Sequence, residues 1–194
     1  MKKIITISRE FGAAGGTIGQ IVAKQLGYEY VDKELIIQAA RDANVDMTRY
    51  FNPDEQVPVI FGFTQSLFDL YSTPVESKIY SKQKEIIRRI GEHGNCVIVG
   101  RNANSILKEF DSSLHVFIHA DFNWRLRRLK KEKMPDQSEQ KIAEHIKAID
   151  KARCKFCTYY TKQQFGHADN YDICLNTSSL GIEQCVQIIC SLAK

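Results

Sequence analysis

Apolar and polar positions follow two different periods along the chain, which predict short strands separated by helices. Runs rich in β-branched residues are typical of buried strands, and apolar residues three and four positions apart are typical of helices. The helical period is clear over residues 18–26, 79–90 and 182–192. The predicted strands are residues 3–8, 28–31, 96–99, 114–119 and 172–175.

This alternation predicts the α/β class, with a five-stranded parallel sheet that carries helices on both faces. Gly27 and Gly94 follow two of the predicted helices, as C-cap glycines commonly do. Ligands bind at the carboxyl ends of the strands in such sheets. Several polar positions fall at these ends: residues 8–16, Asp32, Arg101, Asp121 and Asn176.

Two segments depart from the plain alternation within what we expect to be a single domain over residues 1–194. Residues 44–75 contain three of the four prolines among many aromatics, which predicts an irregular insertion suited to binding an acceptor. A long helical stretch starts at residues 136–139, DQSE, a spacing typical of a capping box, and runs toward Phe165 and Gly166.

Composition narrows the class of protein. With 194 residues, 43% hydrophobic and 26% charged, the chain is long enough to bury one substantial core. It has no N-terminal signal pattern and no apolar run near the ~18 residues of a membrane span, so we expect a cytoplasmic protein without a membrane partner. The net charge of +4 suits a phosphorylated ligand. Apart from residues 125–131 the basic residues are dispersed, so stable nucleic-acid binding is not expected, and the oligomeric state stays open.

The six cysteines are expected to be reduced thiols in such a compartment. Cys154 and Cys157 have the spacing of a ligand pair, which His145 and His167 could complete as a zinc site. The favoured interpretation is two helical cysteines with no metal.

The most informative segment is residues 4–19, IITISREFGAAGGTIG, where a β-branched run enters a glycine-rich turn that opens onto a helix. Backbone amides and the helix dipole converge at such a junction and bind phosphate. Compared with the strict P-loop pattern, Glu10 occupies the position of the first glycine and Gly16 that of the lysine. The alternative is a tight turn whose glycines serve only close packing.

The chain resembles the cytidylate kinase-like family of P-loop phosphotransferases, within the nucleoside monophosphate kinase fold. The segments that carry the resemblance occur in the family's order and span nearly the whole chain. Two positions depart from it: Gly16, which is often basic in the family, and Val99, where cytidylate kinases carry an acidic residue. The matching segments are SREFG at 8–12, VIVGRNA at 97–103, DKAR at 150–153, YDICLNT at 171–177 and GIE at 181–183.

The resemblance implies a three-layer P-loop kinase fold with a helical lid at about residues 130–166, Mg²⁺ as cofactor and ATP as phosphoryl donor. It also assigns roles. The implied catalytic residues are Arg125, Arg128, Arg153 and Asp150. The implied acceptor-binding residues are Asp32 and Arg101, and Thr17 is the implied magnesium ligand. The implied phosphate- and ATP-binding residues are Ser8, Arg9, Gly12, Ala13, Ala14, Gly15, Gly16, Thr17 and Asn176.

The residue types fit this chemistry, because phosphoryl transfer depends on positioned reactants and on cations that neutralise phosphate charge more than on covalent catalysis. The guanidinium group of an arginine can bind a phosphate with two hydrogen bonds. Simpler roles remain open for several of them. Arg101 could form a surface ion pair, and Asp150 with Arg153 an intrahelical one. Thr17 could bond its own backbone at the helix start, and Asp32 could cap a helix that begins at Lys33.

The sequence therefore predicts an enzyme that transfers the γ-phosphoryl group of ATP to a nucleoside monophosphate, CMP foremost, or to a related phosphorylated small molecule. Its partners would be small-molecule nucleotides. Two alternatives stand beside it: a non-catalytic nucleotide- or phosphometabolite-binding protein with a degenerate P-loop, and a kinase for a different acceptor. Without the lysine, we expect a guanidinium group from Arg9, Arg125, Arg128 or Arg153 to supply the missing charge.

Overall fold

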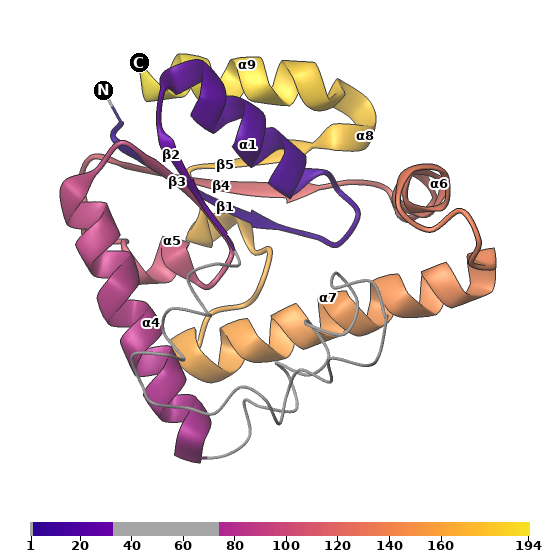
Figure 1. The fold of residues 1–194 in the computed structure, drawn as a ribbon, viewed down its shortest axis with the longest axis horizontal. Helices are drawn as coiled ribbons and strands as arrows, with labels where there is room; N and C mark the ends of the chain where they lie inside the picture. The colour runs from indigo at the N-terminus through magenta and orange to yellow at the C-terminus, as the bar shows by residue number, and fades with distance from the viewer. Residues whose placement is uncertain (1, 33–73) are drawn as a thin grey trace.

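A five-stranded, fully parallel sheet forms the centre of the molecule (Figure 1). The computed structural model describes residues 2–32 and 74–194. The strands follow one another in the order β2-β3-β1-β4-β5. Their bounds are β1 Ile4–Arg9, β2 Glu29–Val31, β3 Cys96–Val99, β4 Ser113–His119 and β5 Ile173–Asn176.

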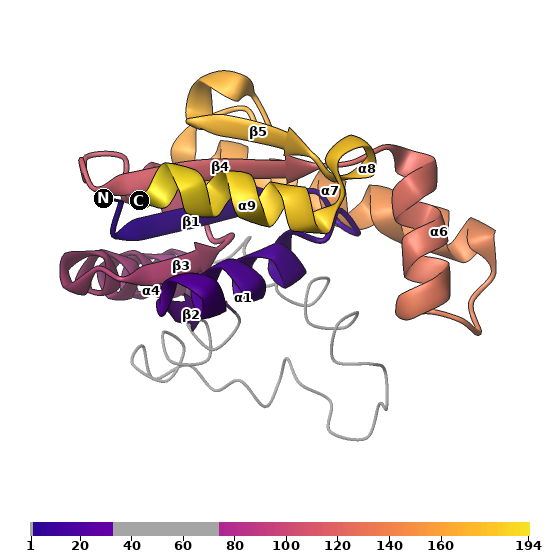
Figure 2. The same ribbon diagram turned by 90° about the horizontal axis from the view of Figure 1, so that it is seen from above.

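Helices cover both faces of this sheet and make a three-layer structure (Figures 1 and 2). On one face lie α1, Gly15–Leu26, and α9, Ile182–Ala193. On the other lie α4, Pro74–His93, the short α5, Ala103–Ile106, and the long α7, Glu139–Thr161. The expected fold class is therefore confirmed.

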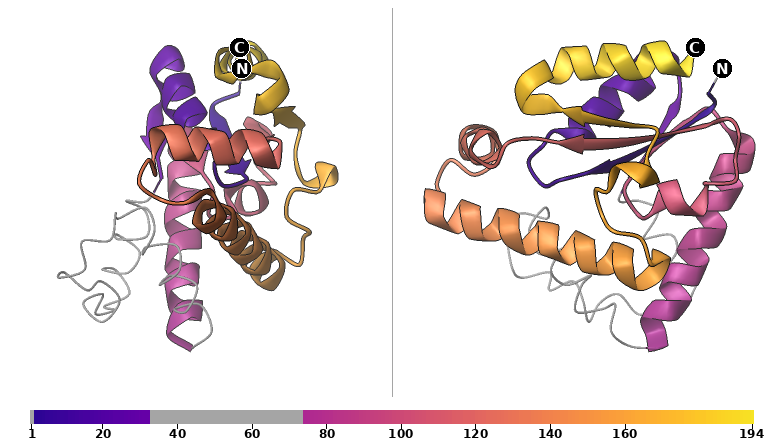
Figure 3. Two further views of the ribbon diagram at one scale, coloured as in Figure 1. Left: turned by 90° about the vertical axis from the view of Figure 1, so that its right-hand side faces the viewer. Right: turned by 180° about the vertical axis from the view of Figure 1, so that it is seen from behind.

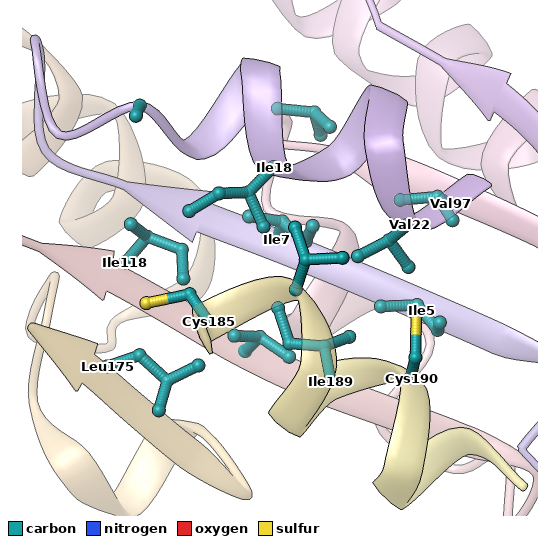
Figure 4. Packing of buried hydrophobic residues seen from close by; sticks show 14 of the residues in the cluster. Ile5, Ile7, Ile18, Val22, Val97, Ile118, Leu175, Cys185, Ile189 and Cys190 are labelled. Carbon is teal, nitrogen blue, oxygen red and sulfur yellow. The ribbon is translucent and has the colours of Figure 1, made fainter. Parts of the chain in front are cut away.

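The strand β1 occupies the middle of the sheet and is buried on both faces, which explains the β-branched run with which it begins, Ile4 to Ile7. Because side chains alternate along a strand, Ile5 and Ile7 point toward α1 and α9, and Ile4 packs in the cluster on the opposite side. Figure 4 shows Ile5 and Ile7 among Ile18 and Val22 of α1 and the side chains of α9. This packing fixes the end of β1, where the glycine-rich turn begins.

Three further short or medium elements flank the last two strands, two of them after the strands' carboxyl ends and one before the amino end of β5 (Figure 3). Helix α6 spans Phe122–Glu132 and follows β4 directly. The 3₁₀ helix η3, Ala168–Asn170, precedes β5, and α8, Thr177–Leu180, follows it. In Figure 1, α6 lies beyond the strand ends, beside the turn between β1 and α1.

The predicted element boundaries agree with the structure to within about one residue for every strand. Gly27 and Gly94 close α1 and α4 with φ of +69° and +70°, and their amides donate to Ala23 O and Ile90 O. Helix α7 begins at Glu139, with Ser138 as its N-cap, and ends at Thr161, before Phe165. Residues 44–73 of the expected insertion lie outside the described residues, and residues 74–75 start α4. Within the described ranges, no helix has the length and apolar character needed to cross a membrane.

Candidate active site

The turn between β1 and α1 adopts a compact loop with two residues in the left-handed region. Gly12 has φ of +83° and Ala14 of +67°. Gly15 packs against the side chain of Arg9 so closely that a Cβ there would lie 2.6 Å from Arg9 Cβ. Glycine is therefore required at position 15 for packing, and α1 starts directly behind the loop.

Side chains from later in the chain hold the carbonyl groups of this loop. Because a peptide unit is planar and trans, a carbonyl held by the protein turns the next N–H group to the opposite side. The donors come from α6, α7 and α8. They are Arg153 Nη1 to Arg9 O at 2.8 Å, Arg125 Nη1 to Phe11 O at 3.0 Å, Arg128 Nη1 to Gly12 O at 3.3 Å, and Thr177 Oγ1 to Ala13 O at 2.8 Å.

The loop amides consequently remain available. In the described part of the chain, no acceptor takes the N–H groups of Gly12, Ala14, Gly15, Gly16 and Thr17. Gly15, Gly16 and Thr17 form the first turn of α1, whose amides have no partner inside the helix and carry the positive end of its dipole. A cluster of unpaired amides at a helix N-terminus is the arrangement that binds phosphate.

A partly buried ion pair ties α7 to the loop. Asp150 Oδ2 lies 2.6 Å from Arg125 Nη1, while Asp150 Oδ1 accepts the N–H of Phe11 at 2.7 Å. Arg125 is also 3.6 Å from Glu10 Oε2 through its Nε, and that carboxylate accepts the N–H of Ala120. Asp150 is thus paired across helices with Arg125, and the intrahelical pair with Arg153 that its spacing allowed is not formed.

Positive charge is concentrated on the other side of the loop. Arg153 donates to the carbonyl of Arg9, and Arg9 lies 3.8 Å from Asp32. Desolvation and the nearby charges of Arg9 and Arg101 lower the pKa of Arg153 well below its usual value, while Asp150 and Asp32 oppose that shift. A bound phosphate would offset this repulsion, so the cluster favours an anionic ligand.

These groups surround a cleft of about 650 Å³ at the carboxyl end of the sheet. Nine of the predicted site residues line it: Arg9, Gly12, Ala14, Gly15, Gly16, Thr17, Asp32, Arg128 and Arg153. The cleft therefore contains the predicted phosphate loop together with predicted catalytic and acceptor-binding residues.

The remaining predicted residues lie beside the cleft or have structural partners. Ser8 is buried and contacts Asn104 Oδ1 at 3.4 Å, and Ala13 is fully buried. Asn176 accepts from Ser178 N at 3.0 Å and so caps α8. Arg101 follows β3 with φ of +61°, between two other residues of positive φ, a backbone conformation that is typical of functional sites.

Sequence reasoning did not select several side chains that line the cleft. Tyr30 donates through its hydroxyl to Asp32 Oδ2 at 3.2 Å, at the end of β2. The others come from the loop, from α1 and from the far end of α6: Glu10, Phe11, Gln20, Leu129, Lys133 and Met134. Lys133 lies just beyond the basic run of residues 125–131, and this position could have indicated it as a further cation of the site.

Thr17 fits the requirements of a magnesium ligand. It lines the cleft, and its hydroxyl has no hydrogen-bond partner among the residues that the structure describes. Mg²⁺ prefers oxygen ligands and is commonly held by few protein groups together with substrate phosphates. The strand end at Val99 offers no carboxylate, so phosphates and water would complete the coordination.

The cysteine pair of α7 is split between two environments. Cys157 is buried and lies 3.5 Å from Thr161 Oγ1, whereas Cys154 is exposed. Over residues 2–32 and 74–194, no three His, Cys, Asp or Glu side chains are grouped as metal ligands.

In this parallel sheet, the central strand is joined to a helix by a glycine-rich loop with unpaired amides among the described residues, and arginines surround that loop. This arrangement is typical of the P-loop kinases. Comparison with known proteins supports this class. Cytidylate kinases of two Bacillus cereus strains are 27% and 25% identical to this chain, each over all of it and over 98% of their own length. The model of the cytidylate kinase-like family matches residues 4–179. The chain belongs to the cytidylate kinase-like family, and it is a kinase.

Solved structures show the same fold. A protein from Eubacterium ventriosum superimposes with a TM-score of 0.75 at 22% identity, covering 98% of this chain and 97% of that one. Shikimate kinase from Bacteroides thetaiotaomicron superimposes with a TM-score of 0.56 at 16% identity, covering 97% of each chain. At these identities the likeness concerns the fold alone.

Proposed function

We propose that the protein transfers the γ-phosphoryl group of ATP to a nucleoside monophosphate, with CMP as the foremost acceptor. The observation that carries the proposal is the union, in one cleft, of the unpaired loop amides with Arg9, Arg128 and Arg153. CMP is placed first because the relatives that cover the whole chain are named cytidylate kinase.

The residues would divide the work as follows. The loop amides of Gly12 and of residues 14–17 bind the donor phosphates, and the arginines of the cleft neutralise the charge on the transferred group. Arg125 and Asp150 keep the loop in shape, which is a positioning role. An oxygen of the acceptor phosphate attacks the γ-phosphorus, and ADP leaves with the bridging oxygen. A bound Mg²⁺ would supply charge neutralisation between the donor phosphates, held on the protein side by Thr17.

Asp32 and Arg101 are proposed to hold the acceptor. Both lie at carboxyl ends of neighbouring strands, β2 and β3. The planar fork of Arg101 suits the acceptor phosphate. The charges of Arg101 and Asp32 both act on Arg153, so donor and acceptor phosphates would share one electrostatic cluster.

The test is an acceptor panel. Purified protein is incubated with ATP and Mg²⁺ against CMP, other nucleoside monophosphates and sugar phosphates, and ADP formation is followed. We expect ADP only with an acceptor present, and fastest with CMP. ADP with a sugar phosphate alone would identify a kinase for another acceptor. ATP binding with no acceptor-dependent ADP would contradict the proposal in favour of a non-catalytic nucleotide-binding protein.

A further inference from the structure

Lys133 is a cation of the cleft that no motif selected. It lies at the C-cap of α6, and its exposed side chain lines the cleft together with Gly12, Gly16 and Thr17. The ammonium group makes no hydrogen bond and no ion pair with any described residue. It is therefore free to bind a ligand.

The other cations that line the cleft are engaged with the protein. Arg128 bonds Gly12 O and pairs with Glu132 at 2.8 Å. Arg153 bonds Arg9 O, and Arg9 lies beside Asp32. Among the described residues that line this cleft, Lys133 is the cation whose charged group has no such partner.

The backbone that carries Lys133 is firmly placed. The N–H groups of Lys133 and Met134 both donate to Leu129 O, at 3.0 and 2.8 Å, and Met134 is buried against α7. Lys130 Nζ then bonds the carbonyls of Pro135 and Gln137, which fixes the following turn. Leu129 itself packs on the loop, since a Cβ at Gly12 would lie 2.9 Å from Leu129 Cδ1. The base of the side chain is thus held beside the loop while its end is exposed.

The loop lacks the lysine that P-loops carry, because Gly16 occupies that position. We infer that Lys133 supplies the missing charge: its ammonium group, reaching across the cleft from the end of α6, binds the β- and γ-phosphates of the nucleotide donor. This inference rests on the proposed function. The N–H groups of Lys133 would donate hydrogen bonds to non-bridging oxygens while the γ-phosphoryl group moves from ATP to the acceptor oxygen and ADP leaves.

The experiment compares nucleotide binding of Lys133→Met with Lys131→Met, by calorimetric titration with ATP and with adenosine. Lys131 is exposed on the same helix and does not line the cleft, so it controls for net charge. We expect Lys133→Met to weaken ATP binding at least about tenfold, the effect of a lost charged hydrogen bond. Adenosine binding and the affinity of Lys131→Met for ATP should stay within about twofold of the wild type.

A relocation variant sharpens the test. The surroundings of Gly16 leave room for a side chain, since the nearest atom to a Cβ there is Tyr30 Oη at 3.7 Å. Adding Gly16→Lys to Lys133→Met should restore ATP binding to within about threefold of the wild type, because the charge then enters the same cleft from the other side. Lys133→Arg should also retain binding.

Three outcomes would overturn the inference: unchanged ATP affinity in Lys133→Met, an equal loss in Lys131→Met, or a loss that Gly16→Lys does not restore. A wild-type protein that binds no ATP would instead refute the proposed function, and the titration reports that separately. A melting curve of each variant shows that it is folded, and Lys133→Gln provides a second neutral side chain.

Discussion

Two adjacent glycines at the start of α1 have opposite surroundings. A Cβ at Gly15 would lie 2.6 and 2.8 Å from Cβ and Cγ of Arg9, and the Cβ of Arg9 cannot move without moving the central strand. A Cβ at Gly16 meets nothing closer than 3.7 Å. The first glycine is thus required by packing, and the second leaves the cleft open.

We therefore expect Gly15→Ala to destabilise the protein by about 1–3 kcal/mol, the usual cost of overpacking, and to weaken ATP binding by displacing the loop. Gly16→Ala, its matched control, should change stability by less than about 1 kcal/mol. Urea denaturation of both variants measures the difference. Equal stabilities would mean that the loop does not pack on Arg9 as described.

The arginines illustrate what residue types alone could not predict. Arg125 and Arg128 were selected for reaching a phosphoryl group, and their catalytic role stays a prediction. In the structure their guanidinium groups bond the carbonyls of Phe11 and Gly12. A carbonyl partner leaves no trace in the sequence, because every residue has one. Only the three-dimensional packing of α6 on the loop could identify these bonds.

At the scale of elements, α7 stabilises the loop by contacts from two of its turns. Besides Asp150, it presents His145, whose ring packs edge-on against that of Phe11 with centroids 5.1 Å apart. Desolvation lowers the pKa of His145 to about 4, from an ordinary value near 6.5. The neutral imidazole is therefore the form that fits between helix and loop.

The pH dependence follows from this shift. Because the folded state holds His145 neutral while the unfolded chain protonates it, its contribution to stability is complete above about pH 6.5 and is lost as the pH falls toward 4. We expect His145→Phe to show a smaller drop in melting temperature between pH 7 and pH 4.5 than the wild type.

His93→Gln is the control for that measurement, since His93 is exposed at the end of α4. It should show the full drop of the wild type. If the melting temperature of His145→Phe falls as much in acid as that of the wild type, the desolvated imidazole does not account for the loss of stability in acid.

The strands were the most predictable elements, because buried parallel strands require continuous β-branched runs and their ends are marked by a change in polarity. Residues 96–99, for example, were predicted with the bounds observed for β3. The end of α7 was less predictable. Its apolar pattern continues through Phe165, but the chain leaves the helix at Lys162, which has φ of +59°.

At the scale of the whole molecule, the cleft joins segments from both halves of the chain. Its walls come from the loop, from Tyr30 and Asp32, from the end of α6, and from Arg153 of α7. The motifs predicted the loop and the arginines. They did not predict Lys133 or Met134, since these reach the cleft only because Leu129 and Met134 pack against α7 and the loop.

A ligand that contacts all these segments binds only the folded protein, so it should stabilise the whole domain against unfolding. At one hundred times its Kd, ATP should add about 2.7 kcal/mol of stability, or roughly 5–10 °C in melting temperature for a domain of this size. Scanning calorimetry with and without ATP measures it. Adenosine at the same molar concentration, which lacks the phosphates, is the control and should raise the melting temperature less. A rise with adenosine and none with ATP would contradict a phosphate site.

The central position of β1 also governs how the chain can fold as it is synthesised. This strand comes first in the sequence, yet its neighbours β3 and β4 come much later: Thr6 and His115, which bond at 2.8 Å, are 109 residues apart. Pairings over such distances form slowly, since a long loop must close first. A nascent chain therefore exposes the isoleucines of β1 until β4 has left the ribosome, so the phosphate loop acquires its shape only after well over half of the protein has been made.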